Sequence, residues 1–195
     1  MKQYTSKDRV EALMLIKIKD SWIENFNIFL EEAENYIDTF TGRNFKADTE
    51  ASAKVYDGDG TRQLIVDDCV LIESISIYDG STTEELDSDK FFTYPANATP
   101  KLRIEIGDEE TSYFIRGQQN ISVMAKWGYS VVPPKEIEFV ASVIVAGMIN
   151  YAYEHNSEVE SESIDDYNVS YNRKEDWVKY ERAKEILEKY KKISF

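Results

Sequence analysis

The feature that most constrains the fold of this chain is a change in the spacing of its apolar residues. Before about residue 46 they recur every three or four positions, which is the period of an amphipathic helix. From 47 to 129 they recur at every second position, as in strands that bury one face, and the helical period then returns. The sequence therefore predicts an α+β protein: a discontinuous helical bundle of about four helices, residues 1–46 and 130–195, with an inserted antiparallel all-β segment, residues 47–129.

Two helices are expected before the β segment. Residues 9–19 form the first, and their apolar side chains fall on more than one side, so they need cover from the protein's own core or from a partner. The second begins after Ser21, has a clear apolar face that includes Trp22, and ends at Gly42. The capping residues expected at their starts are Thr5 or Ser6 for the first helix, and the pair Ser21 and Glu24 for the second.

Two more helices are expected after the β segment. Pro133 and Pro134 suit the start of the third, which should end near His155. Its apolar run, residues 139–152, is too short to cross a bilayer and is typical of a helix in a protein core. An acidic loop with a possible strand follows, and residues 175–192 form the last helix. Because the N-terminus lacks the apolar region of a signal peptide, we expect an intracellular protein.

Two Asp-Gly turns punctuate the β segment. Asp57 and Asp59 are spaced like the start of a calcium-binding EF-hand loop. That loop needs Asp or Asn at its fifth position and Gly at its sixth, where this chain has Thr61 and Arg62, so no metal site is expected. Hairpin turns are favoured instead. The residues expected at the tips of the insertion are Asp57, Gly58, Asp59, Gly60, Asp79 and Gly80.

The sequence carries no common catalytic signature. A single cysteine, Cys69, excludes a disulfide within the chain, and its apolar neighbours indicate a buried thiol. His155 is the single histidine and has no nucleophile beside it in the sequence. Glycine-rich phosphate loops and zinc-binding helices are absent as motifs. We therefore expect no enzyme, no cofactor and no metal, although a carboxylate pair for glycoside hydrolysis could still meet in space.

The net charge is −14, from 23 basic and 37 acidic residues. Binding to a phosphate backbone depends on Lys and Arg, so a general affinity for nucleic acid is excluded. An acidic binding module stays open, for instance a DNA mimic that covers a basic protein surface. If the protein competed with DNA for a basic DNA-binding protein at low salt, and this competition disappeared at high salt, it would be such a mimic.

Three features of the sequence occur together in a known family. A β insertion ending in Gly128 and Tyr129 leads through two prolines into a long central helix. An acidic loop runs into SESIDDYNVSY, residues 161–171, and the closing helix ends in ILEKY. The chain thereby resembles, over nearly its whole length, the head-tail connector proteins of tailed bacteriophages, also called head completion or adaptor proteins.

This resemblance implies a structural protein of the virion neck, at the head-tail junction, assembled in the cytoplasm of the bacterial host. Copies would form a homo-oligomeric ring of about twelve beneath the portal protein, facing a stopper, tail-completion or tail protein. Double-stranded DNA would pass through the channel without sequence-specific binding, and no membrane is involved. Another ring-forming neck protein, a stopper or tail-completion protein, is the alternative.

Contact residues are expected in three groups. The subunit interface is expected at Leu13, Met14, Ile16, Ile164, Tyr167, Val169 and Tyr171. Docking to the portal is expected at Trp177, Tyr180, Tyr190, Lys191, Lys192 and Phe195. The two Asp-Gly turns are expected to face a tail-side partner or solvent.

Overall fold

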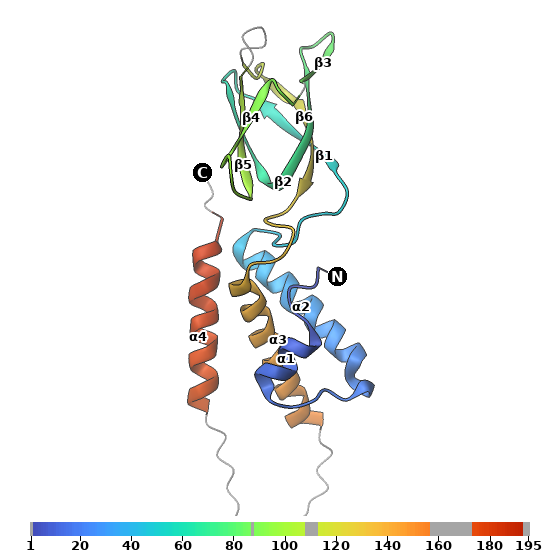
Figure 1. Ribbon diagram of the computed structural model, residues 1–195, viewed down its shortest axis with the longest axis vertical. Coiled ribbons are helices and arrows are strands. Elements are labelled where there is room, and N and C mark those ends of the chain that lie inside the picture. The colour runs from blue at the N-terminus through green and yellow to red at the C-terminus, as the bar shows by residue number, and fades with distance from the viewer. Residues whose placement is uncertain (1, 87, 108–112, 157–172, 193–195) are drawn as a thin grey trace, which may run out of the picture. The chain divides into compact units, whose positions relative to one another are not determined.

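The chain divides into two compact units in the computed structural model (Figure 1). Residues 1–43 and 134–195 form the helical unit, and residues 44–133 form the β unit. The α+β class, with a helical bundle interrupted by an antiparallel sheet, is confirmed. The residues that the structure describes are 2–86, 88–107, 113–156 and 173–192.

The helical unit is organised around one central helix. The helices are α1 Lys7–Met14, α2 Ile23–Thr41, α3 Lys135–Asn156 and α4 Arg173–Tyr190. α3 is central because α1, α2 and α4 all pack against it. The buried side chains that join α1, α2 and α3 are Val10, Ile18, Phe26, Leu30, Ala33, Val145, Ala146 and Ile149.

α3 begins directly after Pro134 and ends beside His155, as expected. By length and composition alone, Lys135–Tyr153 could cross a membrane, so the sequence-based statement that no segment is long enough was too strict. However, 44% of that stretch is buried inside the protein. Burial in the bundle core accounts for the same apolar composition.

α1 is shorter than the sequence predicts. Its cap at Ser6 is confirmed, since the Ser6 hydroxyl accepts a hydrogen bond from the Arg9 amide at 3.3 Å. The helix ends at Met14 and not at Lys19, because Leu15 adopts a left-handed φ of 58°. The apolar period of this segment therefore continues past the point at which the helix stops.

α2 has the expected apolar face and the expected end. Gly42 closes it with a left-handed φ of 68°, a conformation that costs glycine little. The predicted Ser21 and Glu24 capping box is wrong: the chain enters α2 through a short 3-10 turn, Asp20–Trp22, and Trp22 occupies the cap position without a side-chain bond. Ser21 therefore lies inside this turn and cannot cap the helix.

The β unit is one six-stranded antiparallel sheet. Its strands are β1 Ser52–Gly58, β2 Gln63–Tyr78, β3 Thr83–Leu86, β4 Phe91–Tyr94, β5 Lys101–Ile106 and β6 Gly117–Trp127. They lie in the order β1-β6-β2-β5-β4, and β3 pairs with the end of β2. With 16 residues, β2 pairs with β5 along its first part and with β6 and β3 along its second.

The strands of the sheet curl toward one another in Figure 1, and irregularities in β2 allow this curvature. The pairing register shifts near Cys69, where β2 passes from β5 to β6, and again after Ile72. Such bulges bend a strand and increase its twist. The core residues are Leu64, Val66, Cys69, Ile72, Ile75, Ile77, Leu86, Phe91, Ile104, Ile106, Phe114, Ile121, Val123, Ala125 and Trp127.

Only the second Asp-Gly turn makes a hairpin among the described strands. Tyr78 pairs with Thr83 across it, so that prediction is confirmed. The first turn joins β1 to β2, but β6 lies between these strands, so the hairpin predicted at Asp57 to Gly60 is wrong. An Asp-Gly turn between two alternating runs indicates a reversal and does not say which strands pair.

Candidate interaction surfaces

The turn after α1 presents apolar and basic side chains together. Leu15 is 90% exposed and Ile16 is 44% exposed, whereas Ile18 is buried. Lys17 and Lys19 are exposed as well. We call residues 15–19 the basic-apolar turn. These five residues include two lysines and no acidic residue, although the net charge of the whole chain is −14.

Glu11 holds the basic-apolar turn in place. Its buried carboxylate accepts the Lys17 ammonium at 2.6 Å and the Ile18 amide at 2.9 Å. Both bonds favour the charged carboxylate, the Lys17 bond most, so the pKa of Glu11 is lowered. The turn is thereby fixed with Ile18 inside and Leu15 outside.

The outer face of α2 is apolar and acidic. Ile28 and Tyr36 are 54% and 52% exposed. Glu24, Glu31 and Glu32 are exposed on the same side of the helix, given 3.6 residues per turn. α2 contains no Lys or Arg. These three carboxylates make no ion pair within the described part of the chain. We call these five residues the α2 outer face.

The inward-facing acidic residues of α2, in contrast, accept hydrogen bonds from the N-terminal segment. Glu34 is 2% exposed and accepts the backbone amides of Lys2 and Tyr4, each at 2.9 Å. Asp38 binds the Lys2 ammonium and accepts the Tyr4 hydroxyl at 2.6 Å. The N-terminal segment is therefore tied to α2, and unpaired acid remains on the outer face.

The end of α4 is attached to α2 in the helical unit. The Tyr190 carbonyl accepts from Arg43 Nε at 2.7 Å, and the Lys192 amide donates to the Thr41 carbonyl at 2.7 Å. Lys191 is exposed, with its ammonium 5.3 Å from the centre of the Phe40 ring. Among the predicted portal-docking residues, Lys191 and Lys192 thus stand at the surface beside the C-terminal end of α2.

Several of the expected contact residues are not at the surface, or lie outside the residues that the structure describes. Leu13 and Met14 are half-buried against the core of the helical unit, while Ile16 is exposed. Trp177 and Tyr180 belong to α4, but their side chains lie outside the described part. The expected residues that lie outside the described residues altogether are Ile164, Tyr167, Val169, Tyr171 and Phe195.

The first Asp-Gly turn is braced by backbone contacts. The Asp57 carboxylate accepts the Gln119 amide at 2.6 Å, and the Gly58 amide donates to Asn120 Oδ1 at 2.9 Å. A Cβ at Gly58 would lie 1.8 Å from the Ile115 carbonyl oxygen, so only glycine fits there. These groups serve the turn itself. Among the described residues, no group of three or more His, Cys, Asp or Glu side chains could hold a metal.

The second turn depends on Asp79. Its carboxylate accepts the amides of Thr82 and Ser81, each at 2.7 Å, and both hydroxyls as well. These bonds favour the charged form, the Thr82 and Ser81 amides most, so the pKa of Asp79 is lowered well below its usual range. Gly80 follows with a positive φ of 102°. The tip is thus a self-contained Asx turn.

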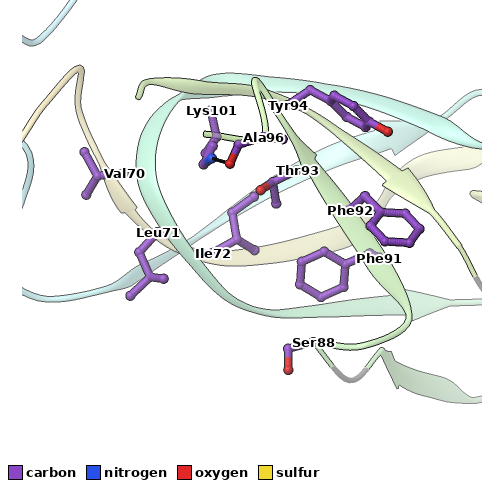
Figure 2. Close-up of a pocket in the computed structure, with 10 residues that line it drawn as sticks. All are labelled: Val70, Leu71, Ile72, Ser88, Phe91, Phe92, Thr93, Tyr94, Ala96 and Lys101. Atoms are coloured by element: carbon purple, nitrogen blue, oxygen red, sulfur yellow. Dashed lines mark hydrogen bonds between the residues drawn. The ribbon is translucent and has the colours of Figure 1, made fainter. Parts of the chain in front are cut away.

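A groove of about 390 Å³ lies between the middle of β2 and β4 (Figure 2). Residues 70–72 line one side and residues 91–94 the other. The Lys101 ammonium is held at one end by the carbonyls of Pro95 and Ala96, at 2.6 Å and 2.8 Å. No other charged side chain lines the groove within the described chain, so it suits an apolar group better than a charged substrate.

The thiol of Cys69 faces the core of the β unit. Cys69 is fully buried, as its apolar neighbours predicted, and burial raises its pKa to about 12. A nucleophilic cysteine needs the thiolate form near neutral pH. Cys69 is therefore a core residue.

No protein-family model matches the sequence, and no curated protein matches it. A solved structure of the neck of an empty gene transfer agent particle, computed with C6 symmetry, contains a similar chain. The TM-score is 0.56 at 10% identity, covering 98% of this chain and 91% of that one. The two chains share one fold. The expected resemblance to phage neck proteins is thereby confirmed at the level of fold. A chain from the virion of a native gene transfer agent particle matches with a TM-score of 0.47 and 12% identity, covering 96% and 89%.

Sequence reasoning missed three exposed apolar residues. Leu15 was placed inside a helix expected to reach Lys19, so its exposure was hidden. Ile28 and Tyr36 lie off the buried face of α2, and a helical wheel of 23–41 would have shown both beside the acidic residues. The β2–β4 groove could not be seen in the sequence, because it depends on the bend of β2.

Proposed function

We propose that the protein is a structural subunit of the neck of a phage-like particle. Copies side by side form an adaptor ring that joins the portal vertex of the DNA-filled head to the tail or the next neck protein. The observation that carries this proposal is the shared fold, over 98% of the chain, with a chain from a particle neck. A ring of about twelve copies is compatible with the sixfold symmetry used for that neck.

The charge of the chain supports a channel through which DNA slides. A wall with a net negative charge gives no counterion-release affinity for DNA, so the genome is repelled and not held. The exposed Lys191 and Lys192, at the end of α4, are the candidates for contact with the portal. A stopper or tail-completion protein, which forms a ring in the same neck, is the alternative position.

Removal of the gene from the phage-like element tests this proposal. Particles made without the protein should have heads that leak DNA and carry no tails, and a supplied copy of the wild-type gene should restore tailed, filled particles. Intact, infectious particles in the absence of the protein would refute the neck function.

A further inference from the structure

We propose that the basic-apolar turn of one subunit docks on the α2 outer face of a second copy, and that this head-to-tail contact closes the ring. The inference rests on the proposed ring function and names the two surfaces that would build it. Both surfaces belong to the helical unit, and the apolar side chains Leu15, Ile28 and Tyr36 on them are each more than half exposed in the single subunit.

The two surfaces offer matching apolar groups. Leu15 is 90% exposed at the tip of a turn that Glu11 fixes from inside, so it stands as a rigid projection. Ile28 and Tyr36 are more than half exposed on α2. They are eight residues apart on the helix, which corresponds to about 12 Å, a span that a five-residue turn can cover. Partly exposed tyrosines beside aliphatic residues are typical of interface centres.

The two surfaces also carry opposite charges. Lys17 and Lys19 follow the apolar tip on the turn; Lys17 is paired with Glu11, whereas Lys19 has no ion pair within the described residues. The α2 outer face carries Glu24, Glu31 and Glu32, with no basic residue anywhere on the helix. Two copies therefore attract through unlike surfaces, whereas two turns or two α2 faces repel each other.

Contact between unlike surfaces has a consequence for assembly. When two subunits bind, one of them keeps its α2 face free and the other keeps its turn free, so growth continues until a ring closes. A twofold dimer, in which one surface meets itself, would stop at two copies. The expected interface residue Ile16 belongs to the turn, whereas Leu13 and Met14 pack against the core of their own subunit.

Two variants of the full chain separate the surfaces. The turn variant combines Leu15→Asn with Lys19→Glu; asparagine tolerates the left-handed conformation of residue 15, so the fold is retained. The face variant combines Ile28→Gln with Glu32→Gln on exposed helical positions, so that the two altered surfaces do not attract each other in a mixture. The control, Ile65→Thr, removes an apolar side chain that is 66% exposed on β2, outside both surfaces.

Sedimentation velocity of the purified chains gives the first readout. The wild type and the control should self-associate, and each double variant should do so at least about tenfold more weakly, as expected for the loss of central interface residues. Circular dichroism should show unchanged helix and strand content in all four. A wild type that stays monomeric at hundreds of micromolar, or variants that assemble like the wild type, would overturn the inference.

An equimolar mixture of the two variants gives the second readout. The turn variant keeps a working α2 face and the face variant keeps a working turn, so the mixture should form one-to-one dimers that neither variant forms alone. A mixture that forms full rings, or that stays monomeric, would overturn the head-to-tail contact. Variants that assemble normally, combined with leaking particles when the gene is removed, would reject these surfaces and leave the neck function standing.

Discussion

At the scale of single residues, Glu34 is the buried charge on which the N-terminal segment depends. Replacement by alanine removes the acceptor of two backbone amides, those of Lys2 and Tyr4. We expect Glu34→Ala to lower the free energy of unfolding by roughly 2–4 kcal/mol, measured by urea denaturation. Glu32→Ala, an exposed and unpaired neighbour, should change it by less than about 0.5 kcal/mol. Equal effects of the two variants would contradict the described role of Glu34.

The Asp79 turn makes a prediction about pH. The folded-state pKa of Asp79 is lowered, so the charged carboxylate stabilises the fold above its unfolded pKa and loses this effect as the pH falls through the folded value. The stability difference between wild type and Asp79→Asn should be constant above about pH 5 and shrink below about pH 4. Denaturation curves from pH 7 down to the lowest pH at which the protein stays folded measure it. A difference independent of pH would count against the turn as described.

Cys69 should be inert in the native protein. Its burial raises the pKa to about 12, so almost no thiolate exists at pH 8. We expect a thiol reagent such as Ellman's reagent to label the chain only after unfolding in guanidinium chloride. Rapid, complete labelling of the folded protein would mean that Cys69 is accessible.

At the scale of secondary-structure elements, α3 is the core of the helical unit. Ile149 is 1% exposed on its inner side, whereas Ile28 on α2 is more than half exposed. Ile149→Ala should cost about 2–4 kcal/mol of unfolding free energy in a chemical melt, because it leaves a cavity. The matched variant Ile28→Ala should cost far less. Similar small losses for both would mean that α3 is not buried as described.

The elements that the sequence predicted well are those with a strong period and a clear stop signal. α2 ends at Gly42, and α3 starts after Pro134, because each residue has a backbone preference of its own. The end of α1 was missed because Glu11 captures the Ile18 amide, a contact that no period reveals. The position of β6 between β1 and β2 was missed because strand order depends on long-range pairing.

The same reasoning explains why the candidate interface was only partly predictable. Excess apolar residues after α1 indicated a contact region, and Ile16 does stand exposed. Which of its neighbours point outward depends on where the helix ends, and Leu15 became visible only once that end was known. The complementary face on α2 could be recognised only once the structure showed which side chains of α2 are exposed, because its acidic and apolar residues then fall on the same side.

At the scale of the whole molecule, the β unit is one continuous stretch of chain, residues 44–133, with its own core. We expect this stretch to fold when produced alone. Its single tryptophan, Trp127, is 4% exposed, so its fluorescence should be blue-shifted and should move to longer wavelength in a cooperative urea transition. An aggregated product, or fluorescence typical of exposed tryptophan without urea, would show that the unit depends on the helices.

Fold, charge and exposed surface support the proposal that copies of this chain form a ring in the neck of a phage-like particle. The most direct measurement is cryo-electron microscopy of the phage-like particles that encode this chain. The account predicts a closed ring of this protein at the head-tail junction, with DNA or an empty channel on its axis. Particles whose junction contains no copy of the chain, or contains it as isolated subunits, would contradict it.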